Sequence, residues 1–563
     1  MRNIFIISAT TLLALSVVSC KGLLDEEVFG QQTAEEMLSN PENVSKVVGQ
    51  AYAEVAWLHD HWGYWGITTL SSDECVNPVR NPGADWDDDG YWKGFNDHSW
   101  TANDQSFEWV WQYSNAGAVL CNKIISQLEP IKESLIESGL YDRFVGELKA
   151  LRCYYYYTLF DSFGRIPYLE DYSSAKVPQS ETWEVWNKLV TSLEEVAPAL
   201  PVVNDANRAE NYGRCSQGMA YTLLARLYLN AKSYGVTPEN CGIEGIAEEK
   251  DFYTRCVACC QKVIESGSYS IEDDFFANFK INNESSKENI FVIVEDGRSN
   301  VNYRDQSGKM ANKLRICMLT LTYPMQTCWK TVDKPWNGFC APEDFLGLYE
   351  AGVDHRGPCP ADAGTHGCDG WGWFLGPVYE NDNSDVILKH AAAQGGKPCI
   401  IVPQVTSLTD ATHNDGARLL KYEVDKSDTD PKLKNKFCDN DFVLLRYADV
   451  LYMQYEAALR AGDNATCTAL LADAEFQKIR SRVGCTPYAS LDLDELLDER
   501  GREFAWELVR RRDLIRYNRY SKGSWNFKPV AADNHCDWFP IPRKMIETSG
   551  GLWTQNPGYE TDK

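Results

Sequence analysis

The residue types that could do chemistry are concentrated between residues 83 and 95, where the chain is GADWDDDGYWKGF. Asp85, Asp87 and Asp89 alternate along this stretch, and three aromatic residues lie among them. Spaced carboxylates can coordinate calcium, or act as a catalytic acid and base. They can also accept hydrogen bonds from sugar hydroxyls while the C–H face of the sugar packs on an aromatic ring. The surroundings of the stretch must decide among these three.

Calcium coordination fits the stretch poorly. An EF-hand loop has acidic residues at positions one, three and five and glycine at position six, and Asp85 to Gly90 follow that order. Position twelve should be a bidentate Glu but is Asn96, and position nine is Lys93, whose charge repels a cation. An irregular calcium site at the three alternating aspartates stays open, and no other cofactor is indicated.

Catalysis has less support than binding. Acidic residues are plentiful, so the residues alone leave a surface glycoside hydrolase open. The chain contains no G-x-S-x-G or H-E-x-x-H motif. Sugar binding is the interpretation that fits best, because aromatic rings, carboxylates, amides and a guanidinium share one window. The candidate ligand-binding residues of this window are Asp73, Asn77, Arg80, Asp85, Trp86, Tyr91 and Trp92.

Further candidates come from the irregular region later in the chain, namely Trp329, Trp336, Trp371 and Trp373. The Gly-rich loop around Trp371 and Trp373 favours their exposure, whereas Trp336 lies in a PWNGF turn that leaves burial and exposure equally open. By contrast, tryptophans within helical patterns are predicted to be core residues, namely Trp109, Trp111, Trp183 and Trp186.

The beginning of the chain predicts export. Arg2 precedes an apolar run that ends in VVSC at Cys20. VVSC resembles a bacterial lipobox, in which the Cys becomes the lipid-modified N-terminus. We therefore expect residues 1–19 to be a signal peptide and Cys20 to carry lipid. The acidic residues 25–27 resemble the surface-export signal of Bacteroidetes lipoproteins.

Composition excludes some classes of function. The 563 residues are 44% hydrophobic, which is ample for a core, and the net charge is −26. Nucleic-acid binding needs a basic surface, and no Lys/Arg cluster supplies one. The acidity also favours neutral over anionic ligands.

The chain has nineteen cysteines, and an exported protein can form disulfides. Cys359 and Cys368 bracket a Gly/Pro-rich loop that a bridge could close. Cys256, Cys259 and Cys260 share a helical face and are predicted to be small buried hydrophobic residues.

Helical periodicity covers most of the chain outside residues 270–435. Predicted helices include residues 181–196, 217–231, 252–265, 442–460, 467–483 and 492–517. Predicted buried faces are Val44, Val47, Val48, Ala51, Val55 and Leu58; Trp109, Tyr113, Ala116, Leu120, Ile124 and Leu128; and Phe144, Leu148, Leu151, Tyr155 and Leu159. Such helix pairs are typical of a tetratricopeptide-like stack, although its thirty-four-residue period is missing.

Residues 270–435 are different in composition. They are rich in Gly, Pro, Asn and Trp, and contain one strand-like run, NIFVIVED. A long irregular insert on a rigid helical frame is where binding surfaces tend to lie.

Several passages together resemble one family. They are GELKALRCYYYYTLFDSFGRIPY, GRCSQGMAYTLLARLYLNAKSYG, NDFVLLRYADVLYMQYEAALR, DERGREFAWELVRRRDLIRY and WFPIPRKMIETSGGLWTQNPGY. In this order they resemble the SusD/RagB family of nutrient-binding outer-membrane lipoproteins. The resemblance covers the mature chain and is weakest at about residues 360–435.

The resemblance implies a mostly α-helical, SusD-like protein over residues 20–563. Its helical scaffold would span about 33–268 and 440–520, with a ligand-binding insert at 270–435 and a C-terminal segment at 521–563. It implies capture of an oligosaccharide or polysaccharide at the cell surface, without chemistry on the ligand. The ligand would pass to a SusC-like TonB-dependent β-barrel transporter in the outer membrane. Capture of peptides for the same kind of barrel is the alternative.

The family signatures themselves indicate scaffold rather than catalysis. Arg446 and Asp449 are three residues apart on a predicted helix, and so are Arg500 and Glu503, so each pair is within reach. The arginines of residues 510–512 could join helices through carboxylate forks.

The lipid anchor can be tested directly. Replacing Cys20→Ala removes the only atom that the lipobox offers for a thioether, so we expect the protein to leave the membrane fraction. Fractionation of cells expressing the variant checks this, with Ser19→Ala as the matched control. Retention of the Cys20→Ala protein in the membrane fraction would contradict the anchor.

Overall fold

The structure is a computed structural model that describes residues 38, 40–83, 85–295, 315–331, 334–424 and 439–559. The chain divides into two compact units, residues 1–46 and 47–563. The predicted signal peptide, Cys20 and the acidic residues after it lie outside the described residues. The division falls between residues 46 and 47, within the residue range of α3 (Pro41–Gln50), and the description below concerns the second unit.

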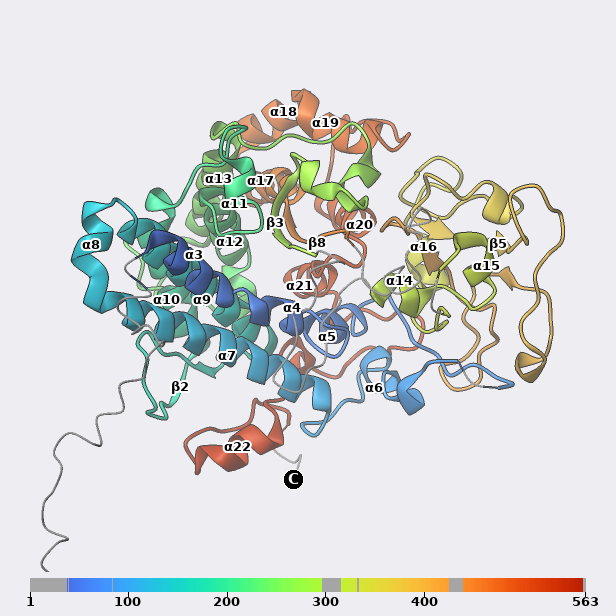
Figure 1. Ribbon diagram of the computed structural model, residues 1–563, viewed down its shortest axis with the longest axis horizontal. Coiled ribbons are helices and arrows are strands. Elements are labelled where there is room, and N and C mark those ends of the chain that lie inside the picture. The colour runs from blue at the N-terminus through green and yellow to red at the C-terminus, as the bar shows by residue number, and fades with distance from the viewer. Residues whose placement is uncertain are drawn as a thin grey trace, which may run out of the picture. The chain divides into compact units, whose positions relative to one another are not determined.

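Six longer helices form the scaffold of this unit (Figure 1). They are α7 (Gln105–Leu128), α9 (Tyr141–Phe163), α10 (Thr182–Val196), α12 (Gln217–Leu229), α13 (Glu249–Glu265) and α17 (Tyr447–Ala461). They pack as successive neighbours, α7 on α9, α9 on α10, α12 on α13, and α13 on α17. The expected stack of paired helices is therefore present, and the predicted buried faces of the α3–α4 segment and of α9 are confirmed.

Shorter helices complete the frame on both sides of the insert. Before the insert they are α4 (Ala53–Leu58), α5 (Tyr64–Thr69), α6 (Lys93–Asn96), α8 (Lys132–Glu137) and α11 (Arg208–Asn211). After it they are α18 (Asn464–Ala472), α19 (Ala474–Ser481), α20 (Leu493–Glu503), α21 (Arg510–Arg516) and α22 (Arg543–Ser549).

The described residues of the insert form short elements only. Its helices are α14 (Arg315–Thr320), α15 (Met325–Trp329) and α16 (Glu343–Leu346). Two antiparallel two-stranded pairs lie within it, β4 (Trp373–Phe374) with β7 (Arg418–Leu419) and β5 (Gly376–Pro377) with β6 (Ile400–Ile401). A third pair, β1 (Ile166–Pro167) with β2 (Gln179–Ser180), follows α9.

Helix α9 is the centre of the scaffold. From Phe144 to Phe163 every side chain except Lys149 is buried, so one amphipathic stripe does not describe it. Its tyrosines remain compatible with burial because their hydroxyls find partners, as when Tyr155 donates to the Ala51 carbonyl at 2.6 Å. The helix ends at Gly164, whose φ of +69° suits glycine.

The predicted buried face of α7 is confirmed at Ile124 and Leu128 but wrong over the first part of the helix. Ala116 is exposed and Trp109 is half-buried, whereas the face packed on α9 carries small residues. A Cβ on Gly117 would lie 2.3 Å from the Tyr155 ring, and Ser114 lies 3.1 Å from Thr158 between their hydroxyl oxygens. Close approach of the two helices therefore selects small side chains, a pattern that hydrophobic periodicity does not detect.

Three further expectations are corrected. Trp183 is 37% exposed rather than core. The predicted helix 442–460 begins with a strand, β8 (Phe442–Arg446), which pairs with β3 (Asn289–Ile293) in the predicted NIFVIVED segment. Cys359 is a free thiol whose Sγ lies 3.4 Å from the Leu375 carbonyl, so no bridge to Cys368 exists. The bridge was predicted from the Gly/Pro-rich loop between the two cysteines, and packing has turned the Cys359 thiol toward a carbonyl instead.

Buried ion pairs join the insert to the frame. The carboxylate of Glu503 accepts from Arg356 at 2.8 Å, from Arg446 at 2.9 Å and from Arg482 at 2.7 Å. These arginines come from the insert, from β8 and from the segment after α19. Burial alone would raise the pKa of Glu503, but the three guanidiniums hold it below its ordinary value.

The charged residues of the two family passages RYAD (446–449) and DERGRE (498–503) are therefore scaffold, as predicted. Their ion pairs differ from the predicted ones. Arg446 and Asp449 do not pair with each other, because Asp449 binds Arg226 at 2.8 Å and Arg500 at 2.9 Å. Neither do Arg500 and Glu503. Contacts between distant segments have replaced the local ones.

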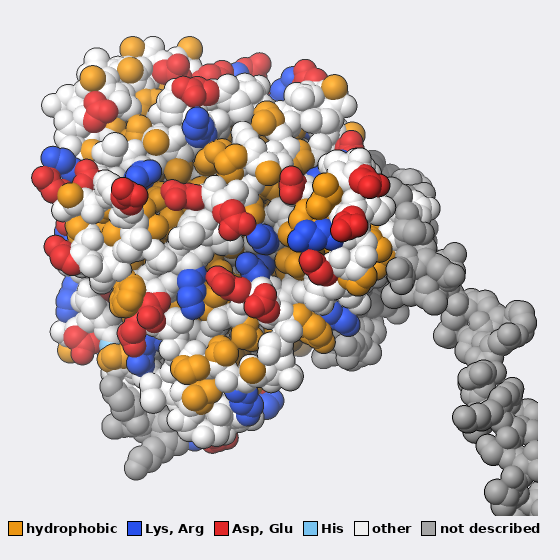
Figure 2. Space-filling model, turned by 90° about the vertical axis from the view of Figure 1, so that its left-hand side faces the viewer, with side chains coloured by type: hydrophobic (Ala, Val, Ile, Leu, Met, Phe, Trp, Pro, Cys, Tyr) orange, Lys and Arg blue, Asp and Glu red, His pale blue; other side chains and the backbone are white. Residues whose placement is uncertain are grey.

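Figure 2 shows the face at the left of Figure 1. Acidic and basic side chains are interspersed over it, and hydrophobic side chains form small patches between them. In the part of the chain that the structure describes, no helix has the length and hydropathy needed to cross a membrane.

Removing Glu503 should destabilise the protein strongly. Glu503→Ala leaves three buried guanidiniums short of a partner, so we expect the free energy of unfolding to fall by about 3–5 kcal/mol in urea titrations. The matched control is Glu195→Ala, since Glu195 is 64% exposed and pairs with Lys149 at 2.8 Å. That change should lower stability by less than about 1 kcal/mol. Equal effects of the two variants would contradict the role of the buried network.

Candidate functional site

Four half-buried aromatic side chains form a continuous series of ring contacts, here called the aromatic platform. It consists of Trp62, Trp86, Tyr91 and Trp336. Ring centroids lie 5.0 Å apart for Tyr91 and Trp62, and 5.7 Å apart for Trp86 and Trp336. His61 joins the two pairs, with its centroid 5.8 Å from Trp62 and 5.5 Å from Trp86. Two segments far apart in sequence, residues 61–91 and the insert, therefore build one surface.

A fully buried aromatic layer supports the platform. Trp65, Trp92 and Phe339 are each 0% exposed. The Trp92 centroid lies 5.2 Å from Trp62, and Phe339 meets Trp86 edge to face at 5.0 Å. Offset and edge-on contacts of this kind are the favoured geometries between aromatic rings. The half-buried rings of Trp62 and Trp86 are thus held in fixed orientations by the buried layer.

The backbone fixes the junction between the two segments. The amide of Trp86 donates to the carbonyl of Trp336 at 3.0 Å, and the amide of Trp336 donates to Met318 at 2.8 Å. A Cβ on Gly338 would lie 2.3 Å from the Trp86 ring. Glycine is required there because the indole lies directly against the backbone.

Carboxylates lie beside the platform. Asp87, Asp88 and Asp89 occupy the turn between Trp86 and Tyr91, and Asp89 is exposed. Burial raises the pKa of Asp88, while a 2.9 Å hydrogen bond from the Trp92 indole opposes that rise. These oxygens can accept hydrogen bonds from a ligand that lies across the rings.

Asp85 points away from this turn and fastens the segment to the insert. Its carboxylate accepts from Asn337 at 2.7 Å and from Gln394 at 2.5 Å, and it pairs with His413 at 2.5 Å. Burial would raise the pKa of Asp85, but the hydrogen bond and charge of His413 hold it below its ordinary value. Asp85 is therefore a positioning residue for the platform.

The arrangement is suited to holding a flat, polar ligand. Aromatic faces cover apolar C–H surfaces, and neighbouring carboxylates take hydroxyl groups. Among the residues that the structure describes, no three His, Cys, Asp or Glu side chains are grouped so that they could hold a metal ion. The alternating aspartates do not converge, because Asp85 binds the insert while Asp87 accepts from the Asp89 amide at 2.9 Å. The calcium site at these residues stays an untested prediction.

Comparison with known proteins places the chain in a family. The sequence model of the SusD family matches residues 390–559, and a model described as starch-binding associating with outer membrane matches residues 69–229. Together the two ranges cover more than half of the chain. The chain belongs to the SusD family. The predicted resemblance is confirmed.

Relatives of this SusD family member agree in fold. The starch-binding protein SusD of Bacteroides thetaiotaomicron is 24% identical over 483 residues, which is 82% of this chain and 80% of that protein. Surface glycan-binding protein A from the same species, solved with laminarihexaose, has a TM-score of 0.67 at 20% identity, covering 92% of this chain and 99% of that one. A SusD superfamily protein from Parabacteroides distasonis has a TM-score of 0.66 at 17% identity, covering 94% of this chain and 100% of that one. The fold is SusD-like, as predicted.

Three predicted ligand residues of this SusD family member are buried or bound to the scaffold. Asp73 accepts a two-pronged contact from Arg510, at 2.8 and 2.7 Å. Arg80 donates to the carbonyls of Gly338 at 2.9 Å and Asp415 at 3.0 Å, and Asn77 is buried. The polar groups of Asp73 and Arg80 serve the scaffold, and Asn77 is 1% exposed, so none of the three belongs to the proposed surface.

The remaining candidates divide by exposure. Trp86, Tyr91 and Trp336 lie on the platform, whereas Trp92 and Trp373 are buried. Trp373 packs against Trp506 with centroids 5.3 Å apart, which places it between the insert and the segment after α20. Trp329 and Trp371 line a separate cavity, described below.

Sequence reasoning missed Trp62. It lies in the turn between α4 and α5, within HDHWGYWG, and it was not distinguished from the helical tryptophans around it. A Cβ on Gly63 would lie 2.2 Å from the Leu58 carbonyl, so the turn is tight. An aromatic residue next to such a glycine turn is the signal that could have identified it.

The positioning role of Asp85 gives a testable expectation. Asp85→Ala leaves the buried side chains of Asn337 and His413 short of an acceptor, so the free energy of unfolding should fall by about 1–3 kcal/mol. Limited proteolysis should also cut faster within residues 81–90. The control is Asp362→Ala, an exposed carboxylate of the insert, which should change neither measurement. An Asp85→Ala protein that resists proteolysis like the parent would refute the role.

Proposed function

We propose that this SusD family member captures a neutral oligosaccharide or polysaccharide on the aromatic platform without altering it. The observation that carries the proposal is four half-exposed rings on a buried aromatic layer, with carboxylates alongside. A pyranose has apolar C–H faces and a rim of hydroxyls, and this surface offers partners for both. Three of the four rings belong to residues chosen from the sequence for this role.

The family supports the same ligand class. The relatives named above are described as a starch-binding protein and a surface glycan-binding protein, the latter with laminarihexaose bound. A laminarin binding SusD-like protein has a TM-score of 0.64 at 18% identity over 92% of this chain. These relatives favour a binding role without catalysis. The net charge of −26 and the acidic turn of residues 87–89 favour neutral glycans and oppose nucleic acid.

The cellular setting forms part of the proposal. The protein would be attached through Cys20 to the outer membrane, facing the cell exterior. It would deliver its glycan to a SusC-like TonB-dependent β-barrel. The lipobox and the family description of proteins associating with the outer membrane support this setting.

Affinity gel electrophoresis tests the ligand and the platform together. The soluble protein, starting after Cys20, should be retarded by starch or by laminarin. Trp86→Ala removes one of the anchoring rings, worth about 1–2 kcal/mol, and should weaken retardation about tenfold. Gly338→Ala should do the same with Trp86 still present, because the added Cβ displaces the indole. Trp183→Ala removes an exposed ring from α10 and is the control.

Each outcome separates the alternatives. Retardation that survives Trp86→Ala and Gly338→Ala would move the site away from the platform. A protein that no neutral polysaccharide retards would contradict the glycan proposal and favour peptides. Reducing ends released by the purified protein would contradict the absence of catalysis.

A further inference from the structure

A cavity of about 530 Å³ opens at a different place on the insert. Its volume lies within the range typical of small-ligand sites. Residues from four segments line it, including Asp274, Phe276, Lys280, Trp329, Trp371 and Glu423. None of them belongs to the platform, and Trp329 and Trp371 were candidate ligand residues from the sequence.

Aromatic side chains form the walls of this cavity. Trp371 is half-buried and packs on His355, with centroids 4.8 Å apart. Trp329 is buried, at 5% exposed, and lies edge to face against Phe374 with centroids 5.8 Å apart. Phe276, also half-buried, follows α13 in the turn that begins the insert. The two half-buried rings, Trp371 and Phe276, can therefore present a face to a ligand, and Trp371 does so at little conformational cost because His355 packs against it.

Polar groups at the edge give the cavity its charge. Asp274 and Lys280 pair at 2.6 Å with about half of each side chain exposed. Glu423 is exposed and accepts from the Ile281 amide at 3.0 Å. Lys421 also lines the cavity, but its ammonium is buried and donates to Glu507 and to two carbonyls. The accessible edge is therefore acidic, which disfavours sulfated or uronic sugars and suits hydroxyl donors.

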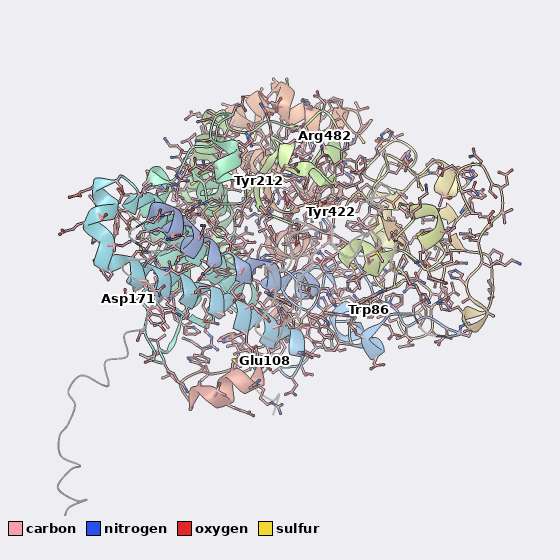
Figure 3. All side chains as sticks on the ribbon, in the orientation of Figure 1. Trp86, Glu108, Asp171, Tyr212, Tyr422 and Arg482 are labelled. Carbon is pink, nitrogen blue, oxygen red and sulfur yellow. The ribbon has the colours of Figure 1, made fainter. Side chains whose placement is uncertain are left out.

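Buried side chains separate the cavity from the platform. Trp329 contacts Phe374 of β4, whose strand partner is Arg418 of β7. Arg418 in turn donates to Asn337 at 2.7 Å, next to Trp336 of the platform. Phe374, Arg418 and Asn337 are all buried. Figure 3 shows Tyr422, which lines the cavity, and Trp86 at separate places beside the insert.

We propose that this cavity is a second binding site for the neutral glycan that the platform captures. This inference rests on the proposed function, because it assigns the same neutral glycan to the cavity. Two sites on one copy make binding of a long polysaccharide stronger than either site alone, because the second contact is intramolecular. A short oligosaccharide occupies the two sites independently.

Isothermal titration calorimetry with laminarihexaose and maltohexaose tests the number of sites. The soluble protein should bind two molecules of one of these sugars. Trp371→Ala and Trp86→Ala should each bind one, and the double variant none. Trp371→Phe keeps a ring and should retain two sites with weaker affinity at one. Circular dichroism confirms that each variant is folded.

Affinity gels with laminarin and starch give a second measurement. Trp371→Ala should weaken retardation about tenfold or more, whereas the control Trp183→Ala should leave it unchanged. A single site that is lost in Trp86→Ala and intact in Trp371→Ala would overturn the second site and leave the proposed function standing. A single site lost only in Trp371→Ala would also overturn it and would move the function to the cavity. No binding of any neutral glycan would overturn both proposals.

Discussion

The buried carboxylates of α20 are the constraint on which the rest of the structure depends. Glu503 holds three guanidiniums from the insert, from β8 and from the segment after α19. Glu499, one turn earlier, accepts from Arg356 at 2.8 Å and from Arg480 at 2.8 Å. Buried ion pairs contribute little net stability against an apolar alternative, but a single missing partner is very unfavourable. The network therefore fixes the position of the insert more than it adds stability, because moving Arg356 away from α20 would leave buried carboxylates short of a partner.

That placement determines both aromatic surfaces. Arg356 and Lys421 come from the insert, and their charges are satisfied only when it lies against α20 and the turn after it. With the insert fixed, Trp336 meets Trp86, and Asp85 reaches its partners across the junction. The platform is thus a consequence of contacts made far from it. A ring that the buried aromatic layer already holds in place loses little conformational entropy when a ligand binds. More of the contact energy therefore contributes to the binding free energy.

Local sequence patterns predicted those parts of the fold that local physics controls. Helix α9 and the scaffold role of DER follow from apolar spacing and charge type. The strand at 442–446 was missed because its pairing with β3 brings together residues about 150 positions apart, a contact that no helical period encodes. The first part of the α7 face was missed because close helix packing selects Gly117 and Ser114, which hydrophobicity does not count. Asp449 and Glu503 pair with arginines outside their own helices, because a buried carboxylate is stabilised most by guanidiniums that donate hydrogen bonds to several of its lone pairs.

The site was predictable in composition but not in exposure. Trp86 and Trp92 lie six residues apart in the same motif, yet one is half-exposed and the other is fully buried. Trp92 packs against Phe95 and Phe339 in the aromatic layer, and Asp88 accepts from its indole, so that ring is satisfied inside the protein. Arg80 was predicted to bind ligand because a guanidinium carries several N–H donors that suit paired oxygen acceptors. The same property lets it bind carbonyl oxygens inside the protein. In this fold the carbonyls of Gly338 and Asp415 in the insert accept those hydrogen bonds. The Arg80 guanidinium therefore joins the insert to the segment that carries Trp86. Residue type fixes what a side chain can bind, and the fold decides whether its partner is the ligand or the protein.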